Sequence, residues 1–466
     1  MNSSTFSDPR SPHFCRRDML KTLSSGFGYL AFAGLATQAA QAATSAREGP
    51  LAPKGTHFPA RAKRVIFLCM RGGPSHVDTF DYKPKLTADS GAAGQRAGTK
   101  LLGSKWKFAQ HGQSGLWISD LFPNVANHAD DLCMLRSMQT DLPSHPQAFL
   151  QMHTGSFQFV RPSLGAWTLY GLGTENENLP GFVTLTPPGA SGGAQNYGSS
   201  FLPAIYQGTR LGTDNRPIAG AQIRNLKSPL NSDIQRAELD LVQTLNRETL
   251  KRDPFNPAVE GVIESYELAF RMQKEMPQVM DLEGESEATK KLYGLENTTT
   301  ADFGRKCLLA RRLVEAGVRF VEVSHGDWDQ HFNLTSALGA NCRSVDQPIS
   351  ALLTDLKERG LLKDTLVIWG GEFGRTPHAQ GGDGRDHNHK AFTMWMAGGG
   401  VKGGFSHGLT DDYGYEAIED KMHVHDLHAT ILHLLGLDHE RLTYRYAGRD
   451  FRLTDVHGNV VKQIIS

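Results

Sequence analysis

Short apolar runs recur along the chain, and each stops abruptly at glycine and a group of polar residues. Residues 64–70, 318–323 and 365–369 form three such runs. Runs of this length, bounded by turn-forming residues, are typical of strands buried on both faces of a parallel sheet. Segments with helical periodicity that end at glycine, residues 306–316 and 349–359, precede two of the runs. The alternation predicts βαβ units and an α/β fold with a mainly parallel central sheet flanked by helices.

The polar residues that follow the three runs are rich in carboxylates and imidazoles. They occupy residues 71–78 after the first run, 324–331 after the second, and 370–375 with 384–387 after the third. In open α/β sheets the ligand binds outside the carboxyl ends of the strands, so we expect these groups to meet at one site. Asp, Glu and His with almost no Cys suit a hard or borderline divalent cation.

The loop after the second run carries the best-spaced candidate ligands. Asp327 and Asp329 stand four and two residues before His331, and both spacings let a carboxylate and an imidazole bind one ion. A solvated loop with internal hydrogen bonds is the alternative interpretation. The full set of predicted metal ligands is Asp327, Asp329, His331, Glu372, Asp386, His387 and Asp78. We expect them to bind one or two divalent ions, of Zn, Mn, Ca or Mg.

The ends and the middle of the chain define its domain organisation. Residues 1–42 are interpreted as a twin-arginine signal peptide with a mildly apolar stretch and an A-x-A cleavage site. Residues 43–61 form a linker, and residues 62–466 form one large α/β domain. Apolar residues at helical spacing predict a helical insertion near residues 231–294.

Charge and composition limit the classes of partner that we expect the protein to bind. Lys and Arg number 49, as do Asp and Glu, and the zero formal charge argues against nucleic acid or an anionic membrane surface. Beyond the signal no segment approaches transmembrane length, so the mature protein is expected to have no membrane segment. The four cysteines outside the signal lie mostly in apolar runs without metal-ligand spacing, and we expect buried free thiols.

Motifs spread over nearly the whole chain carry a resemblance to a known superfamily. They lie at residues 71–81, 121–126, 328–331, 371–377, 384–387 and 425–436. They resemble the alkaline phosphatase/sulfatase superfamily, and more closely an exported, sulfatase-like family of unknown function with a twin-arginine signal. The resemblance implies an alkaline phosphatase-like α/β fold for the domain and hydrolysis of sulfate or phosphate esters at a metal site.

The chain departs from the superfamily pattern at residues that carry chemistry. Residues 71–73, Arg-Gly-Gly, stand where the first strand of the superfamily normally ends in a metal-binding Asp. The catalytic nucleophile maps onto residues 144–146, and the closest match puts His145 at the nucleophile position. Glu372 keeps a possible ligand at a later strand end, whereas Phe373 beside it cannot bind metal. The resemblance therefore implies the scaffold more firmly than the usual esterase chemistry.

These departures make water activated by the metal the simplest attacking group. An arginine at a strand end can hold an anion by a bidentate fork, although a Glu–Arg pair that fixes the turn is the alternative. The predicted catalytic residues are Ser144 and Ser75 as fallback nucleophiles, His76 or His145 as general acid or base, and Arg375 or Arg71 as the anion-binding group.

Two functions remain open at this point. The first is an exported, metal-dependent hydrolase of sulfate or phosphate esters, acting on a glycan or another anionic substrate and not on nucleic acid. The second is a catalytically degenerate, sulfatase-like protein that binds anionic glycans or a surface or secretion partner. The missing Asp and the missing nucleophile favour the second, and the ligand-rich strand ends favour the first.

Export through the twin-arginine route depends on the Arg16-Arg17 pair. Replacing both residues by lysine should leave the precursor in the cytoplasm, because this route requires the arginine pair itself and not only positive charge. Immunoblots of periplasmic and cytoplasmic fractions measure the outcome. Unchanged export of the double variant would contradict the prediction.

Overall fold

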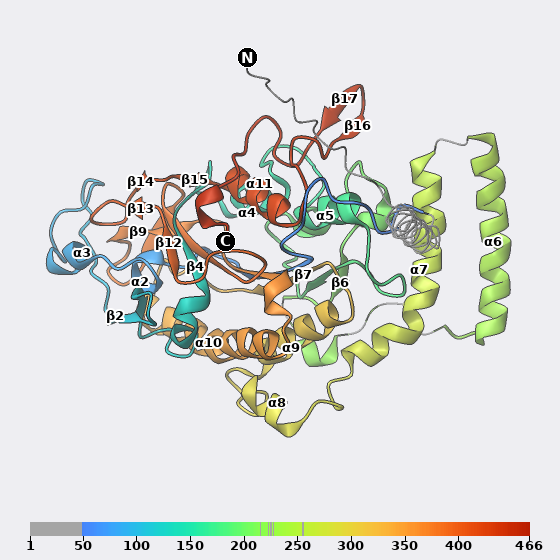
Figure 1. The fold of residues 1–466 in the computed structure, drawn as a ribbon. Coiled ribbons are helices and arrows are strands. Elements are labelled where there is room, and N and C mark those ends of the chain that lie inside the picture. The colour runs from blue at the N-terminus through green and yellow to red at the C-terminus, as the bar shows by residue number, and fades with distance from the viewer. Residues whose placement is uncertain (1–48, 215, 222, 224–225, 227, 254–255) are drawn as a thin grey trace, which may run out of the picture. The chain divides into compact units, whose positions relative to one another are not determined.

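The computed structural model of the protein describes residues 49–214, 216–221, 223, 226, 228–253 and 256–466 (Figure 1). The predicted signal peptide, residues 1–42, and the first part of the predicted linker lie outside the described residues. In the described part of the chain, no helix is both long and apolar enough to cross a membrane.

A mainly parallel sheet runs through the centre of the domain, as predicted. Its strands follow the order β12-β4-β11-β8-β1-β7-β5-β6, and β15 also pairs with β4. Only β11 runs antiparallel to its neighbours, β8 and β4. The bounds are β1 Arg64–Met70, β4 Leu132–Gln139, β5 Phe182–Leu185, β6 Thr209–Leu211, β7 Phe320–His325, β8 Thr365–Gly370, β11 Phe392–Ala397, β12 Phe405–His407 and β15 Met422–His423. The three apolar runs therefore form β1, β7 and β8, which are neighbours.

Helices cover both faces of this sheet (Figure 1). Alternate residues of β1 belong to two different core clusters, so the strand is buried on both sides. One face packs against α9, Ala301–Glu315, and α10, Leu334–Glu358. The other packs against α4, His145–Thr154, α5, Leu164–Leu172, and α11, Val424–Leu434. Burial on two faces explains why these strands are continuous apolar runs and do not alternate.

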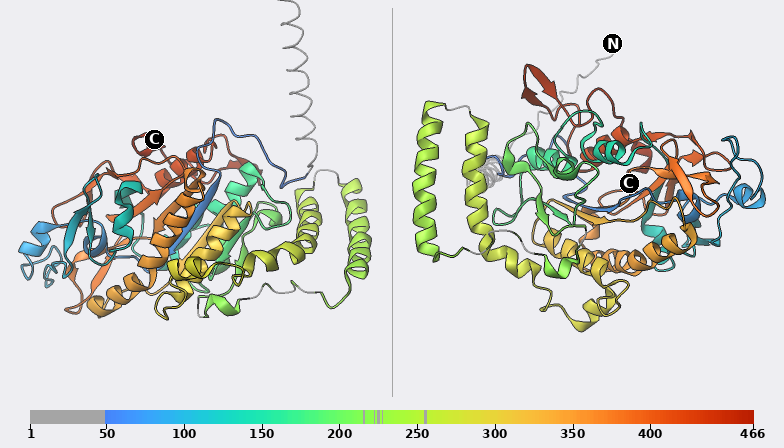
Figure 2. Two further views of the ribbon diagram at one scale, coloured as in Figure 1. Left: turned by 60° about the horizontal axis from the view of Figure 1, so that its bottom comes forward. Right: turned by 180° about the vertical axis from the view of Figure 1, so that it is seen from behind.

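Three helices occupy the segment where a helical insertion was predicted: α6 Ser232–Arg252, α7 Pro257–Met280 and α8 Glu287–Leu292. The long helices α6 and α7 pack side by side and antiparallel (Figure 2). Arg236 of α6 binds Glu267 of α7 at 2.9 Å, and the amide of Gln243 donates to the carbonyl of Ile263 at 2.8 Å. Because most of α6 is exposed, these polar contacts are what hold it to α7.

Shorter elements complete the domain. The remaining helices are α2 His76–Thr79 and α3 Pro84–Ala88. The remaining strands are β2 Phe108–His111, β3 Leu116–Ser119, β9 Gly374–Ala379, β10 Arg385–Asn388, β13 Leu409–Thr410, β14 Ala417–Glu419, β16 Tyr444–Tyr446 and β17 Arg449–Phe451. The 3-10 turns are η1 Val125–Asp131, η2 Gly193–Tyr197, η3 Ala204–Tyr206, η4 Ile218–Gly220, η5 Leu362–Asp364 and η6 Lys462–Ile464.

The four cysteines of the domain are buried free thiols, as expected: Cys69, Cys133, Cys307 and Cys342.

Two histidines, one fully buried and one half-buried, have strongly lowered pKa values. His428 of α11 is fully buried, and its Nε2–H donates to the carbonyl of Met152 in α4 at 2.7 Å. His325 at the end of β7 accepts the indole N–H of Trp328 at 3.0 Å. Burial lowers the pKa of each imidazole to about 3, because the charged form would lose its hydration.

The neutral state of His428 predicts a pH-dependent stability. Between pH 6.5 and about 3 the unfolded chain protonates this ring and the folded chain does not, so the free energy of unfolding falls as the pH falls. In His428→Gln, the amide can still donate to Met152 but does not titrate. The slope of stability against pH should therefore decrease by about 1.4 kcal/mol per pH unit between pH 6 and 4. Urea titrations at a series of pH values measure it, and equal slopes for both proteins would contradict the prediction.

Candidate metal centre

The carboxyl ends of β1, β7 and β8 lie level with one another. Met70 pairs with His325, and Cys69 pairs with Gly370, so the three following loops leave the sheet at the same edge. The amide of Arg71 donates to the carbonyl of His325 at 2.9 Å, and the amide of Trp328 donates to the carbonyl of Arg71 at 3.2 Å. The parallel register therefore brings the polar groups after the three strands together, as the sequence predicts.

A buried arginine ties these loops to one another. Arg375 on β9 is fully buried, and its Nε donates to the carbonyl of Gly73 at 2.9 Å. Its Nη1 donates to the carbonyl of Arg385 at 3.2 Å. Its Nη2 donates to the carbonyl of Gly72 and, at 2.5 Å, to Oδ1 of Asp329. All three nitrogens are thus bound by protein oxygens, an arrangement that does not favour the predicted role of Arg375 as a fork for an anion.

Four side chains converge in front of this arginine: His145, Asp329, His331 and His387. Their ligand atoms all lie within 4.8 Å of one another. Oδ1 of Asp329 is 2.9 Å from Nε2 of His331, 3.2 Å from Nε2 of His145 and 3.3 Å from Nε2 of His387. Nε2 of His331 and Nε2 of His387 are 2.9 Å apart. We call this group the imidazole–carboxylate cluster.

Hydrogen bonds behind two of the rings decide which nitrogen faces the cluster. Nδ1 of His387 lies 2.7 Å from the carbonyl of Pro143, and because a carbonyl only accepts, this nitrogen carries the proton. Nδ1 of His331 lies 2.5 Å from Oε1 of Gln380. Each Nε2 therefore presents a lone pair to the other and to Asp329. Lone pairs and a carboxylate at these distances repel one another, and a shared cation removes the repulsion.

His145 approaches the cluster from the first turn of α4. Its Nδ1 donates to Oε1 of Glu372 at 2.6 Å, and its Nε2 faces Asp329. Burial alone would keep this ring neutral, but the two carboxylates outweigh burial and raise the pKa of His145 to about 9. Burial likewise opposes ionisation of Asp329, yet the hydrogen bond from His145 and the charge of Arg375 hold the pKa of its carboxyl far below the usual range.

Glu372 stands behind His145 and not among the four converging groups. It is fully buried, and both carboxylate oxygens accept the amide N–H of Gly72, at 3.0 and 3.1 Å. Gly72 has a φ of +118°, and a Cβ built there would lie 2.6 Å from the amide nitrogen of Asp329. The Asp that the superfamily places near this strand end therefore has no room here, and Glu372 supplies a carboxylate that orients His145 instead.

Several predicted residues are engaged elsewhere. Asp78 is fully buried and accepts from Arg385 at 2.7 and 3.1 Å and from Ser75 at 2.6 Å. His76 is buried, and its Nε2 donates to the carbonyl of Gly414 at 2.9 Å. The side chains of Asp78, Ser75 and His76 thus bind other parts of the protein and lie outside the four converging groups, and their predicted roles stay predictions.

The remaining predicted residues lie around the cluster or outside it. Asp327 is exposed at a φ of +67°, and Asp386 binds Arg96 at 3.2 Å. Neither belongs to the four converging groups, and their roles as metal ligands stay predictions. Ser144 is the half-buried N-cap residue beside His145, and Arg71 lies 3.5 Å from Asp214. Both remain close to the loops that form the site.

A second, fully buried group lies beneath α4 and was missed from the sequence. Cys69, His153 and Glu322 have ligand atoms within 4.8 Å of one another. Nε2 of His153 is 3.2 Å from Oε2 of Glu322, and its Nδ1–H donates to the carbonyl of Phe149 at 2.7 Å. Burial opposes the charge on His153, but Glu322 raises its pKa. This ion pair anchors α4, and the signal for it was a glutamate in the middle of an otherwise apolar strand.

Fold and site together define an α/β protein with a candidate metal centre at the carboxyl ends of its parallel strands. Residues 62–465 match the family described as "Protein of unknown function (DUF1501)". The chain belongs to this family.

Comparisons with other proteins give structural likeness at low sequence identity. A sulfatase from Pseudoalteromonas sp. is 13% identical over 82% of this chain and 68% of its own, with a TM-score of 0.35. The lipoteichoic acid synthase LtaP from Listeria monocytogenes is 8% identical over 86% and 78%, with a TM-score of 0.40. An alkaline phosphatase from the Antarctic bacterium TAB5 is 12% identical over 73% and 92%, with a TM-score of 0.29. No curated protein matches the sequence.

The close approach at Gly72 predicts an unusual cost of substitution. Gly72→Ala and Gly91→Ala both place a side chain at positive φ, but a Cβ at residue 91 meets no atom within 4 Å. Gly91→Ala should cost about 1–2 kcal/mol for the backbone alone. Gly72→Ala should cost about 1–3 kcal/mol more, because the backbone of Asp329 must move. Urea unfolding of the two variants measures the difference, and equal losses would show that the contact at Gly72 is not tight.

Proposed function

We propose that this protein is an exported, metal-dependent hydrolase of sulfate or phosphate esters. The observation that carries the proposal is the convergence of His331, His387 and Asp329, whose ligand atoms lie 2.9–3.3 Å apart. Two imidazoles with outward-facing N–H groups tied to oxygen acceptors, together with one carboxylate, are typical of catalytic sites with three protein ligands. Likeness of the sequence motifs to the alkaline phosphatase/sulfatase superfamily supports the same class of reaction.

The residues present fit one divalent cation, and zinc suits their chemistry best. His331 and His387 would bind it through Nε2, and Asp329 through Oδ1, which Arg375 holds in place. Nitrogen and oxygen donors without sulfur also accept Mn, whereas Ca and Mg prefer oxygen ligands alone. A cation held there would supply Lewis acidity toward an anionic ester and toward water.

His145 is the residue best placed to move a proton. Glu372 accepts the proton-bearing Nδ1 of His145, so the ring is oriented with Nε2 toward the cluster. A carboxylate–imidazole pair of this kind stabilises the protonated ring and allows it to donate a proton to the leaving oxygen. Since the nucleophile of the superfamily maps onto His145 itself, attack by water is the simplest course.

The second candidate is a binding protein without turnover. Two observations favour it. Gly72 leaves no room for a side chain where the superfamily pattern has a metal-binding Asp, and the guanidinium of Arg375 is bound by oxygens of the protein itself. Such a protein would bind an anionic glycan or a surface partner at the same strand ends.

Metal analysis and kinetics of four proteins test the proposal. Wild type purified without chelator should contain one divalent ion per chain by plasma mass spectrometry, and it should hydrolyse p-nitrophenyl sulfate or phosphate. His331→Ala should lose the metal. His145→Gln should keep the metal but lose about 10²–10⁴-fold in kcat, because only proton transfer is removed.

His433→Ala is the matched control, since His433 packs against Phe58 and not against the cluster. It should keep both metal and activity. Circular dichroism checks that each variant is folded. A folded wild type that binds no added Zn²⁺ or Mn²⁺ and hydrolyses neither ester would refute the hydrolase and favour the binding protein.

A further inference from the structure

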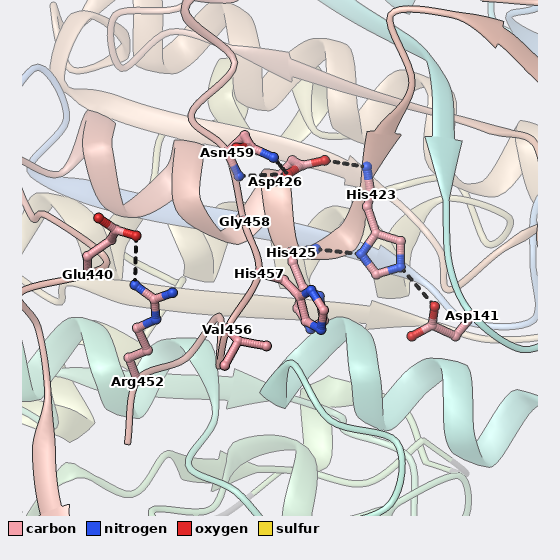
Figure 3. Close-up of a pocket in the computed structure, with 10 residues that line it drawn as sticks. All are labelled: Asp141, His423, His425, Asp426, Glu440, Arg452, Val456, His457, Gly458 and Asn459. Carbon is pink, nitrogen blue, oxygen red and sulfur yellow. Dashed lines mark hydrogen bonds and ion pairs between the residues drawn. The ribbon is translucent and has the colours of Figure 1, made fainter. Parts of the chain in front are cut away.

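A polar cavity opens beside the N-terminal turns of α4 and α11 (Figure 3). Its volume is about 530 Å³, which is within the usual range of small-molecule sites. A second cavity of about 240 Å³ adjoins it, because both are lined by Asp141, His425, Arg452 and His457. The cavity is formed by Asp141 and by residues 423–459, which are far from Asp141 in sequence, and the proposed metal ligands do not line it.

The walls of this cavity are fixed by hydrogen bonds. Asp141 accepts from the amide of Gln151 and, at 3.3 Å, from Nε2 of His423. Nδ1 of His423 in turn accepts the amide N–H of His425 at 3.2 Å, and Asp426 accepts the amide N–H of His423 at 2.9 Å. Figure 3 shows this chain of contacts along one wall. The site therefore exists before any ligand arrives.

Groups on the other walls are free to bind a ligand. The ring of His457 is exposed and lies flat against the ring of His425, with centroids 5.0 Å apart and planes 8° apart (Figure 3). It has no hydrogen-bond partner among the described residues. Arg452 uses Nη1 to bind Glu440 at 3.0 Å at the opposite side. One imidazole and one guanidinium thus supply donors, and carboxylates supply acceptors.

The charged side chains of the lining disfavour an anion as the ligand. Asp141, Asp426 and Glu440 contribute three carboxylates against the single positive charge of Arg452. Burial also lowers the pKa of His425, so that ring adds no positive charge at neutral pH. An uncharged ligand whose groups both donate and accept hydrogen bonds fits such walls, and hydroxyl groups do both.

The adjoining cavity adds apolar surfaces to these polar ones. Phe157, Phe159 and Phe451 line it, and Phe159 is 58% exposed. The guanidinium of Arg161 lies 4.3 Å from the ring centroid of Phe451. Flat apolar faces beside hydrogen-bonding groups match sugar rings, which have apolar C–H faces and hydroxyl edges.

The cavity is also close to the candidate metal centre. Asp141 of its wall precedes His145 by four residues, so their Cα atoms are at most about 15 Å apart. Pro143 between them accepts the N–H of His387. A substrate with its ester at the cluster could therefore place its next sugar units in the cavity.

We propose that this cavity binds the uncharged, hydroxyl-rich saccharide part of the substrate, next to the anionic ester. The position of the ester rests on the proposed function, whereas binding of the saccharide does not. His457 and Asp141 are the residues that form hydrogen bonds with the hydroxyl groups of the saccharide. In this arrangement the anionic ester of the substrate lies at the metal centre, and its neutral sugar part lies in the acidic cavity.

Binding of neutral oligosaccharides to the full-length mature protein tests this proposal. Unsulfated tetrasaccharides of glucose, galactose, mannose and N-acetylglucosamine are titrated by calorimetry and by saturation-transfer NMR. At least one should bind saturably to wild type. His457→Ala and Asp141→Asn should each weaken that binding about tenfold, through loss of one hydrogen-bonding group. His111→Ala on β2, which lines neither cavity, is the matched control and should bind like wild type.

Three outcomes would overturn the proposal. In one, none of the tetrasaccharides binds at about 10 mM. In another, binding is equal in wild type and both cavity variants. In the third, Zn²⁺ or Ni²⁺ titrates a site that His457→Ala removes and the saccharides do not bind, so the cavity takes a cation. A protein that binds saccharide but holds no metal would refute the proposed hydrolase and leave this inference standing.

Discussion

The buried guanidinium of Arg375 is the contact on which the site depends. It donates to the carbonyls of Gly72 and Gly73 after β1, to the carbonyl of Arg385, and to the carboxylate of Asp329 after β7. A fully buried charge is tolerated only when its donors are satisfied, so these loops must stay where their oxygens meet it. Because the acceptors belong to separate segments, one side chain sets the position of the whole imidazole–carboxylate cluster.

Electrostatic balance in the cluster follows from this arrangement. Asp329 faces Arg375 on one side and three imidazoles on the other, and the charges of Arg375 and of protonated His145 keep its carboxylate ionised. His145 lies between Asp329 and Glu372 and is the one ring of the cluster that two carboxylates contact directly. His331 and His387, whose Nδ1 atoms face oxygen acceptors, have only lone pairs to offer. The same neighbours thus set two rings with Nε2 toward Asp329 and hold the third ring between two carboxylates, the arrangement on which the proposed function rests.

The backbone at Gly72 determines what the carboxylate of Glu372 binds. With no space for a side chain at this strand end, the amide N–H of Gly72 binds Glu372, and Glu372 orients His145. Glu372 therefore binds the ring of His145 and does not join the four converging groups.

Apolar periodicity alone was enough to place β1, β7 and β8 and the edge where the site lies, because buried parallel strands are marked by uninterrupted local runs. Asp329, His331 and His387 could be predicted as candidate metal ligands for the same reason, since these residues follow such strands. Only the tertiary structure showed that Asp329 and not Asp327 lies in the cluster, that Asp78 pairs with Arg385, and that Asp141 and His457 line one cavity. Those choices depend on loop conformation and on partners hundreds of residues apart, which no local pattern records.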